Sequence, residues 1–364
     1  MYSVLRLTVC LAISLLFFSY SAYSVEAGVE QLDVDISVFD PGIPADVSTH
    51  RRLKVFPLVR KAESRYLPFL LHQTLVASGQ WGVVRVRAMT NGYQSSELLI
   101  TGTIQQSNGE VLILKIQAVD GAGRTWLDKA YTGTATEAGY QQHSVDPFQH
   151  VFDQIANDLL DMRATLAPIQ LQHIAKIATL RYGAGLSPET FGEYLLKDEA
   201  GIYQVRRLPA ENDPMLKRIS RIREYEYLFI DTENEQYLGL FDEMKKTYDL
   251  WRQYNRELLV YIRNQATDAA SDKHQFRRGS YASMKDVYEN YAWFRRQEQY
   301  LEELSRGFNS EVFPTVMQLE NSVINLSGDL ENKYAQWQSI LRSIFELERG
   351  TLPHSSSDNN SSNP

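Results

Sequence analysis

The sequence predicts an α+β amino-terminal domain, with an antiparallel-rich sheet and two covering helices, followed by an all-α domain of long antiparallel coiled-coil helices. Two observations support this prediction. Alternating apolar and polar residues, separated by glycine-containing turns, fill much of the first half, whereas apolar residues in steps of three and four fill the last third. We expect a sheet domain at residues 25–166, a connector of short helices at 167–230 and a helical bundle at 231–350.

The first 24 residues are typical of a secretory signal peptide. Arg6 precedes an apolar run, residues 7–20, which ends at the small-residue pattern of residues 22–24. The run of 14 residues is shorter than the roughly 20 that cross a bilayer. We therefore expect cleavage near Ser24/Val25 and export to the periplasm of a Gram-negative bacterium.

Cysteine usage and charge narrow the class further. The single cysteine, Cys10, lies in the apolar run, and a thiol-free exported chain fits a bacterial periplasm. Lipid attachment at Cys10 is the alternative, but Val9 is bulky where a small residue is expected. Without Arg6, 36 basic residues face 45 acidic ones, and this net charge of −9 disfavours nucleic acid. No later apolar run is long enough for a membrane span.

The sheet domain is predicted element by element. Strands are expected at residues 34–38, 53–58, 82–89, 97–105, 111–119 and 124–131. A helix should begin at Leu67-Pro68 and end at Ser78-Gly79, and another should follow Asp146-Pro147 and cover one sheet face. The turns Asn108-Gly109 and 120–123 supply the positive φ that tight hairpins require. The later half of the sheet should therefore be an antiparallel meander.

This order of elements resembles a known family. A helix ending in Ser78-Gly79, a strand, the segment 99–104 (Leu-Ile-Thr-Gly-Thr-Ile), the turn 120–123 and a closing helix are similar to the TolB amino-terminal domain family. The same design occurs in the curli secretion lipoprotein family and in outer-membrane activators of penicillin-binding proteins. The resemblance covers about 110 residues, a third of the chain. It implies an envelope protein that binds other proteins, and it implies no catalytic residue.

The remainder of the chain is predicted to be helical. Cap-and-proline pairs at Ser187-Pro188 and Asp213-Pro214 each begin a helix. Three heptad seams follow, at residues 237–262, 284–308 and 323–344, and they predict three long helices of a coiled coil. The polar end at 351–364 is predicted to be disordered.

The seams carry Tyr and Trp where a rigid rod usually has Leu and Ile, which predicts a loosely packed or partly exposed core. Asn255, Glu298 and Ser327 interrupt the apolar rows. They either select the register between helices or face water at the edge of the seam.

Catalytic signatures are weak. No histidines are spaced as a metal site, and neither a phosphate-binding loop nor a Gly-x-Ser-x-Gly elbow occurs, so we predict no metal, cofactor or catalytic residue. A cell-wall glycan hydrolase that uses paired carboxylates is the alternative function. Its candidate acids are Glu189, Glu193 and Asp198.

Binding residues are predicted around a basic turn in this acidic chain. Its cations are Arg206, Arg207, Arg218 and Arg221. Such a patch suits an acidic partner or an anionic cell-wall glycan. The alternative is a solvated helix whose arginines pair with Glu224 and Glu226. Four aromatic residues lie off the seams and are predicted to be exposed binding residues: Tyr225, Tyr227, Trp293 and Tyr300.

Together these patterns predict a non-enzymatic periplasmic accessory or scaffold protein. It should bind another envelope protein or protein complex through the α/β domain and the long helices. A third hypothesis is assembly of the chain with itself into a ring or fibre through the helices.

Overall fold

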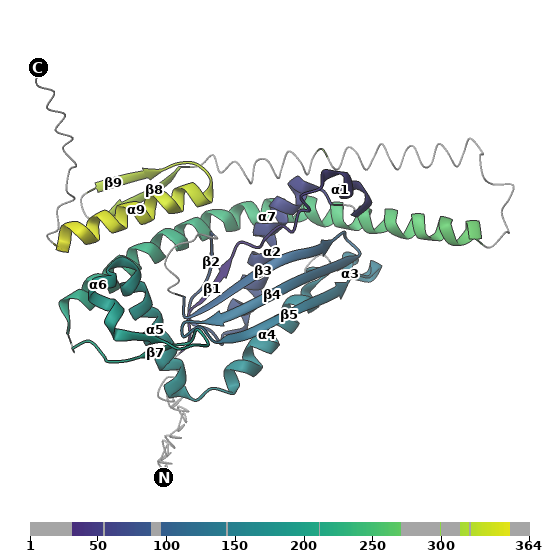
Figure 1. The fold of residues 1–364 in the computed structure, drawn as a ribbon. Helices are drawn as coiled ribbons and strands as arrows, with labels where there is room; N and C mark the ends of the chain where they lie inside the picture. The colour runs from purple at the N-terminus through teal and green to yellow at the C-terminus, as the bar shows by residue number, and fades with distance from the viewer. Residues whose placement is uncertain are drawn as a thin grey trace, which may run out of the picture.

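The structure, a computed structural model, describes residues 31–53, 55–88, 96–142, 145–210, 212–270, 299, 314–319 and 322–349. It is a mixed α/β protein with a five-stranded sheet in its amino-terminal part and one very long helix later (Figure 1). No helix among these residues combines the length and hydrophobicity needed to cross a membrane. The predicted signal peptide, the second seam (284–308) and the tail (351–364) lie outside the described residues.

The predicted sheet strands are confirmed, apart from the one at 53–58. The sheet has the order β2-β1-β3-β4-β5, in which β1 is parallel to β2 and β3, and β3, β4 and β5 are antiparallel neighbours. Its strands are β1 (Val34–Ser37), β2 (Val84–Arg87), β3 (Leu98–Ser107), β4 (Val111–Asp120) and β5 (Thr125–Thr134). Gly109 and Gly123 turn the two hairpins with φ of 79° and 94°, as tight turns require.

The predicted strand at 53–58 is wrong, because α1 (Val47–Leu53) and α2 (Pro57–Ser78) occupy this region. Pro57 is the first residue of α2, and Pro68 lies inside the helix. A proline has no N–H to donate, so it leaves the carbonyl four residues earlier without its helical partner. Here that carbonyl, of Ser64, accepts the backbone N–H of Phe39 at 2.8 Å. The carbonyl that Pro68 leaves free therefore connects α2 to Phe39, just after β1.

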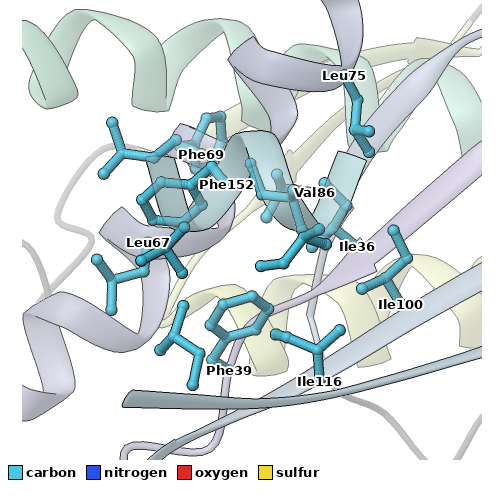
Figure 2. Close-up of a cluster of buried hydrophobic side chains, with 14 of the residues drawn as sticks. Ile36, Phe39, Leu67, Phe69, Leu75, Val86, Ile100, Ile116 and Phe152 are labelled. Atoms are coloured by element: carbon cyan, nitrogen blue, oxygen red, sulfur yellow. The ribbon is translucent and has the colours of Figure 1, made fainter. Parts of the chain in front are cut away.

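One face of the sheet is covered by α2 and by α4 (Gln149–Ala164), as predicted for the helix after Asp146. Figure 2 shows Phe69 and Phe152 of these helices in one buried cluster with Ile36, Ile100 and Ile116 of the strands. We call this cluster the sheet core. The other parts of the domain are α3 (Glu137–Gln141) and the turns.

The long helix α7 (Pro214–Ala270) runs without interruption across residue 230, where the boundary between connector and bundle was predicted. Its first seam does not pack against another long helix among the described residues. Tyr237, Phe241, Met244, Tyr248 and Trp251 belong to the sheet core, where they pack on α2. The aromatic seam is buried, not loosely packed, because aromatic rings from α2 fill the spaces between its own rings.

This aromatic contact is close. The ring of Tyr66 stacks on that of Phe241 with centroids 4.4 Å apart, and Phe56 meets Trp251 edge-on at 5.8 Å. Asn255 is also buried, and its Nδ2 donates to the carbonyl oxygen of Asn108 at 2.9 Å. Asn255 thus binds the β3–β4 turn, and neither of the two roles predicted for it applies.

The helix α7 also closes the free edge of the sheet. The strand β2 has no neighbour on its outer side. Next to it, the Asn234 amide nitrogen donates to the Val86 carbonyl at 2.6 Å, and the amide oxygen accepts the Val86 N–H at 3.0 Å. An unpaired edge strand can pair with other chains. At Val86 the Asn234 side chain makes the two hydrogen bonds that a neighbouring strand would otherwise make.

A smaller region follows the sheet domain, consisting of α5 (Pro168–Leu186), α6 (Pro188–Phe191), a 3₁₀ turn (Gly192–Tyr194) and the hairpin of β6 (Leu195–Lys197) and β7 (Tyr203–Val205). The helix predicted to begin at Ser187-Pro188 is present as α6, which is about one turn long, and the hairpin was not predicted. The region binds the β4–β5 turn. Arg181 donates to the Gly121 carbonyl at 2.8 Å, and the Tyr203 N–H donates to the Ala122 carbonyl at 2.7 Å.

Residues 314–319 and 322–349 form what we call the C-terminal unit, a hairpin of β8 (Thr315–Leu319) and β9 (Ser322–Leu326) followed by α9 (Leu330–Arg349). The predicted helix at 323–344 therefore begins too early. Val323 lies in β9, and Asp329 begins α9 by accepting the Asn332 N–H at 2.9 Å. In Figure 1, α9 runs beside the first half of α7.

The C-terminal unit belongs to a second hydrophobic cluster, separate from the sheet core. This second core joins α9 and the β8–β9 hairpin to the first half of α7 and to α5 and α6. Phe229 of α7 and Trp337 of α9 lie at its centre, with ring centroids 6.0 Å apart. The two cores thus share α7, one on each half of the helix.

Candidate interaction surfaces

The structure does not bring the predicted binding residues together into one patch. Arg206 and Arg207 are exposed and follow β7, whereas Arg218, Arg221, Tyr225 and Tyr227 lie on α7. The Arg207 guanidinium lies 4.9 Å from the centroid of the Tyr194 ring and 3.8 Å from a Glu193 carboxylate oxygen. Both side chains of this ion pair are largely exposed. Such a pair contributes little to stability and exchanges easily with an outside anion.

Arg218 and Arg221 have a different role. Both bind Glu348 of α9, at 3.0 Å and 2.7 Å, so these two cations join α7 to the C-terminal unit. They are not paired with Glu224 or Glu226, as the solvated-helix alternative expected. Of the four predicted arginines, only Arg206 and Arg207 remain turned toward solvent without a role in joining elements.

The predicted aromatic candidates are not exposed binding residues as a group. Tyr225 is half-buried, and its carbonyl accepts the Trp337 indole N–H at 3.1 Å. The Tyr227 ring lies between two guanidinium groups, 4.0 Å from that of Arg85 and 5.1 Å from that of Arg223. Trp293 and Tyr300 lie outside the described residues.

Each of the candidate acids of the hydrolase alternative has a local structural role. The Glu193 carboxylate is paired with Arg207. The Asp198 carboxylate accepts the Ile202 N–H at 2.8 Å and so closes the β6–β7 turn. Glu189 lies in the first turn of α6, where acidic side chains favour the helix N-terminus. Within the described part of the chain, no group of three or more His, Cys, Asp or Glu side chains is placed to hold a metal ion.

The most extended free surface is the second face of the sheet over β3, β4 and β5. Figure 1 shows α2 and α4 behind these strands, and no described helix lies in front of them. The outward side chains of β3 and most of those of β4 are partly exposed, and Gln117 of β4 and the outward side chains of β5 are exposed. We call this surface the open face. Its members are Leu99, Thr101, Thr103, Val111, Ile113, Lys115, Gln117, Val119, Asp128, Ala130, Thr132 and Thr134.

The open face is almost neutral. Lys115 on β4 and Asp128 on β5 form an ion pair across the two strands, and the other members carry no charge. Hydroxyl and branched apolar side chains alternate over a flat area, where Ile113 lies opposite Thr132. A surface of this composition favours contact with another protein surface over binding to phosphate or to an anionic glycan.

The same face is closed over β1 and β2, where a network of buried charged groups replaces the neutral surface. The Arg87 guanidinium lies 3.2 Å from an Asp35 carboxylate oxygen and 3.3 Å from one of Glu226. The Tyr334 hydroxyl contacts both Arg87 and Glu226, and the Ser96 hydroxyl donates to Asp35 at 2.5 Å. These groups come from the sheet, α7 and α9, so the network joins three parts of the chain.

Two groups of the network, the Tyr334 phenol and the Arg87 guanidinium, each keep one protonation state. Burial raises the pKa of the Tyr334 phenol well above its usual range, and the Glu226 carboxylate raises it further. The charges of Asp35 and Glu226 also hold the pKa of Arg87 high, against its burial. A neutral phenol and a charged guanidinium are therefore fixed at physiological pH.

The sequence contained part of the signal for the open face. The alternation of Val111, Ile113 and Lys115 with Leu112 and Leu114 predicts a strand with one face less buried than the other. Sequence alone did not show which part of that face α7 and α9 would cover, since their contacts with β2 link residues more than 130 positions apart.

Comparison with known proteins gives no relative. No family model, curated protein or solved structure matches this chain.

Proposed function

We propose that the chain is a non-enzymatic accessory or scaffold protein of the bacterial periplasm, which binds another envelope protein through its α/β domain and its long helix. The observation that supports this function best is the open face of the sheet. Of the two faces of β3, β4 and β5, one packs on α2 and α4, and no described element covers the other.

The features of the chain outside the open face agree with a binding role. The amino-terminal segment has the pattern of an export signal. Ionisable side chains buried within the described residues join one element to another, as Arg87 and Arg252 do. The partner's surface should be neutral and either flat or strand-like, because Lys115 and Asp128 already neutralise each other. Arg206 and Arg207 would add a separate contact for acidic groups.

Site-specific photo-crosslinking in cells tests the proposal. A crosslinking residue at Gln117 or Thr132 on the open face should capture the same envelope protein. The matched control, Asp161, is an exposed position on α4. A double substitution Gln117→Lys and Thr132→Lys should abolish co-purification of that protein and leave the urea unfolding midpoint unchanged. Equal capture from all three positions, or from none, would overturn the proposal.

Two further measurements separate the proposal from its alternatives. Amino-terminal sequencing of the periplasmic protein should find a start near Val25. Incubation of purified protein with isolated sacculi should release no glycan fragments. Release by the wild type, abolished in Glu193→Gln, would instead support the hydrolase.

A further inference from the structure

The C-terminal unit is attached to the rest of the molecule through desolvated charges. Lys333 and Glu233 are 1% and 3% exposed, and the Lys333 Nζ lies 3.3 Å from a Glu233 carboxylate oxygen. The Thr315 hydroxyl also donates to Glu233, and Arg65 of α2 approaches its second oxygen at 3.9 Å. One carboxylate of α7 therefore holds both the hairpin and the helix of the C-terminal unit.

A second such contact lies about two turns earlier on α7. The Tyr334 hydroxyl reaches Glu226 of α7 and Arg87 of β2, both of them buried. Near the end of α9, Glu348 binds Arg218 and Arg221 at the surface. Polar groups thus determine the position of the unit along the whole first half of α7.

Buried charges make an interface specific for one partner geometry, but they add little to its stability. Each buried charge loses its hydration, and a buried ion pair often stabilises less than an apolar pair of the same size. The apolar side chains that the unit buries belong to the second core, and none of its described residues enters the sheet core. Departure of the unit would therefore leave the apolar packing of α2, α4 and the strands in place and remove the Tyr334 hydroxyl from Arg87.

Departure of the unit would uncover one face of α7. This face combines apolar side chains with two carboxylates. Its members are Ile222, Glu226, Phe229, Ile230 and Glu233. The structure also shows what this face accepts, because α9 now occupies it. The occupant is a helix that places a lysine, a tyrosine and a tryptophan at positions i, i+1 and i+4, here Lys333, Tyr334 and Trp337.

We propose that the C-terminal unit is a reversible latch that opens as one body, and that its opening frees this face of α7 for a helix of the binding partner with the same lysine, tyrosine and tryptophan pattern. The opening stands independently of the proposed function. The identity of the occupant rests on the proposed function and specifies its contact chemistry.

Hydrogen exchange of the full-length mature protein tests the opening. Amides of α9 should become exposed about 100-fold more often than amides of α2 and β4, because local opening costs less free energy than unfolding of the sheet core. If α9, α2 and β4 exchange through openings of equal frequency, the latch is excluded.

Variants identify which contacts hold the latch. Tyr334→Phe should open α9 about tenfold more often and leave α2 unchanged. Lys333→Met, which leaves the buried Glu233 carboxylate without its lysine, should also open α9 about tenfold more often. The control Tyr140→Phe removes a phenol hydrogen bond to Gly109 in the other half of the molecule. It should not raise the opening frequency of α9 relative to that of α2. Equal changes in α9 and α2 would contradict the proposal.

The occupant is tested with a fluorescent peptide of residues 328–349. It should bind the full chain at a rate that opening limits, so that the rate levels off with peptide concentration. A peptide with Lys333→Glu and Tyr334→Ala should not bind. Opening without peptide binding would overturn the docking claim, whereas failure of the proposed function would show itself as loss of position-specific crosslinking at the open face.

Discussion

The two halves of α7 use the same helical period to make different contacts. The middle of the helix, residues 237–251, presents Tyr237, Phe241, Tyr248 and Trp251 to α2, and aromatic rings fill the space between the helices. The first half presents Glu226 and Glu233 among apolar residues and binds the C-terminal unit. The comparison teaches that a heptad seam shows which face of a helix is buried but does not show what buries it.

The largest expected effect separates the halves through their tryptophans. Trp251 and Trp337 are both almost fully buried, one in each core. We expect Trp251→Ala and Trp337→Ala each to cost about 3–5 kcal/mol. In hydrogen exchange, Trp251→Ala should weaken α2 and the strands, whereas Trp337→Ala should weaken only the C-terminal unit and its neighbours. Identical patterns would show that the two cores unfold as one.

A second prediction concerns Arg252, which lies in the second half of α7 and is 1% exposed. Its guanidinium binds the buried Asp146 carboxylate at 2.6 Å and also contacts Asp249. Arg252→Met should lower the free energy of unfolding by about 3 kcal/mol, because Asp146 keeps its charge and loses its partner. Urea denaturation measures this loss. Arg263→Met, at a surface pair with Glu110, is the control and should cost under about 1 kcal/mol.

A third prediction tests where α7 passes the sheet edge. Asn234→Ala leaves the N–H and carbonyl of Val86 without their side-chain partner, and it should cost about 2 kcal/mol. Asn234→Asp removes the donor and also places a buried carboxylate beside the Val86 carbonyl oxygen, so it should cost at least as much. If both variants unfold at the wild-type urea concentration, the amide does not stabilise this edge.

The fourth prediction is a pH dependence. Burial raises the pKa of Glu63 on α2, against the opposing effects of Arg60 and of hydrogen bonds from Ser107 and Tyr248. The native state therefore binds this proton more tightly than the unfolded state, and the stability it contributes at low pH is lost as pH rises. Glu63→Gln should flatten that decline in urea titrations above the ordinary pKa of glutamate. An unchanged slope would contradict the prediction.

The smallest expected effect is at the surface of the first half. Arg221→Ala removes one of two arginines from Glu348 and should cost less than about 1 kcal/mol, since Arg221 is half exposed and Arg218 remains. Differential scanning calorimetry should show a shift of a degree or two at most. A larger shift would mean that the C-terminal unit depends on this surface pair.

Much of the sheet was predictable, because its signals are local. Alternation and the turn at Asn108-Gly109 sufficed for β3 and β4. The start of α2 was missed because Pro68 is normally a first-turn residue, and only the distant N–H of Phe39 makes it acceptable inside the helix. The β8–β9 hairpin was missed because Val323 and Ser327 happen to continue the spacing of α9.

The candidate surfaces were less predictable than the fold. The roles of Arg218 and Arg221 depend on Glu348, which lies more than 120 positions away. A local sequence pattern cannot predict such a contact. The export signal and the resemblance to envelope domains remain predictions. The sequence could predict the open face only as a less buried side of β4, because its extent depends on which part of the sheet α7 and α9 cover.

The β3–β4 hairpin has lost the freedom that surface turns usually have. The backbone carbonyl of Arg252 lies where a side chain at Gly109 would be, Tyr140 donates to the Gly109 carbonyl at 2.6 Å, and Asn255 binds Asn108. Most hairpin loops lie at the surface and tolerate inserted residues, which can extend into solvent. Here one added residue would lift α7 from the sheet domain, so this short connection should keep a constant length in any descendant of the chain that retains the helix.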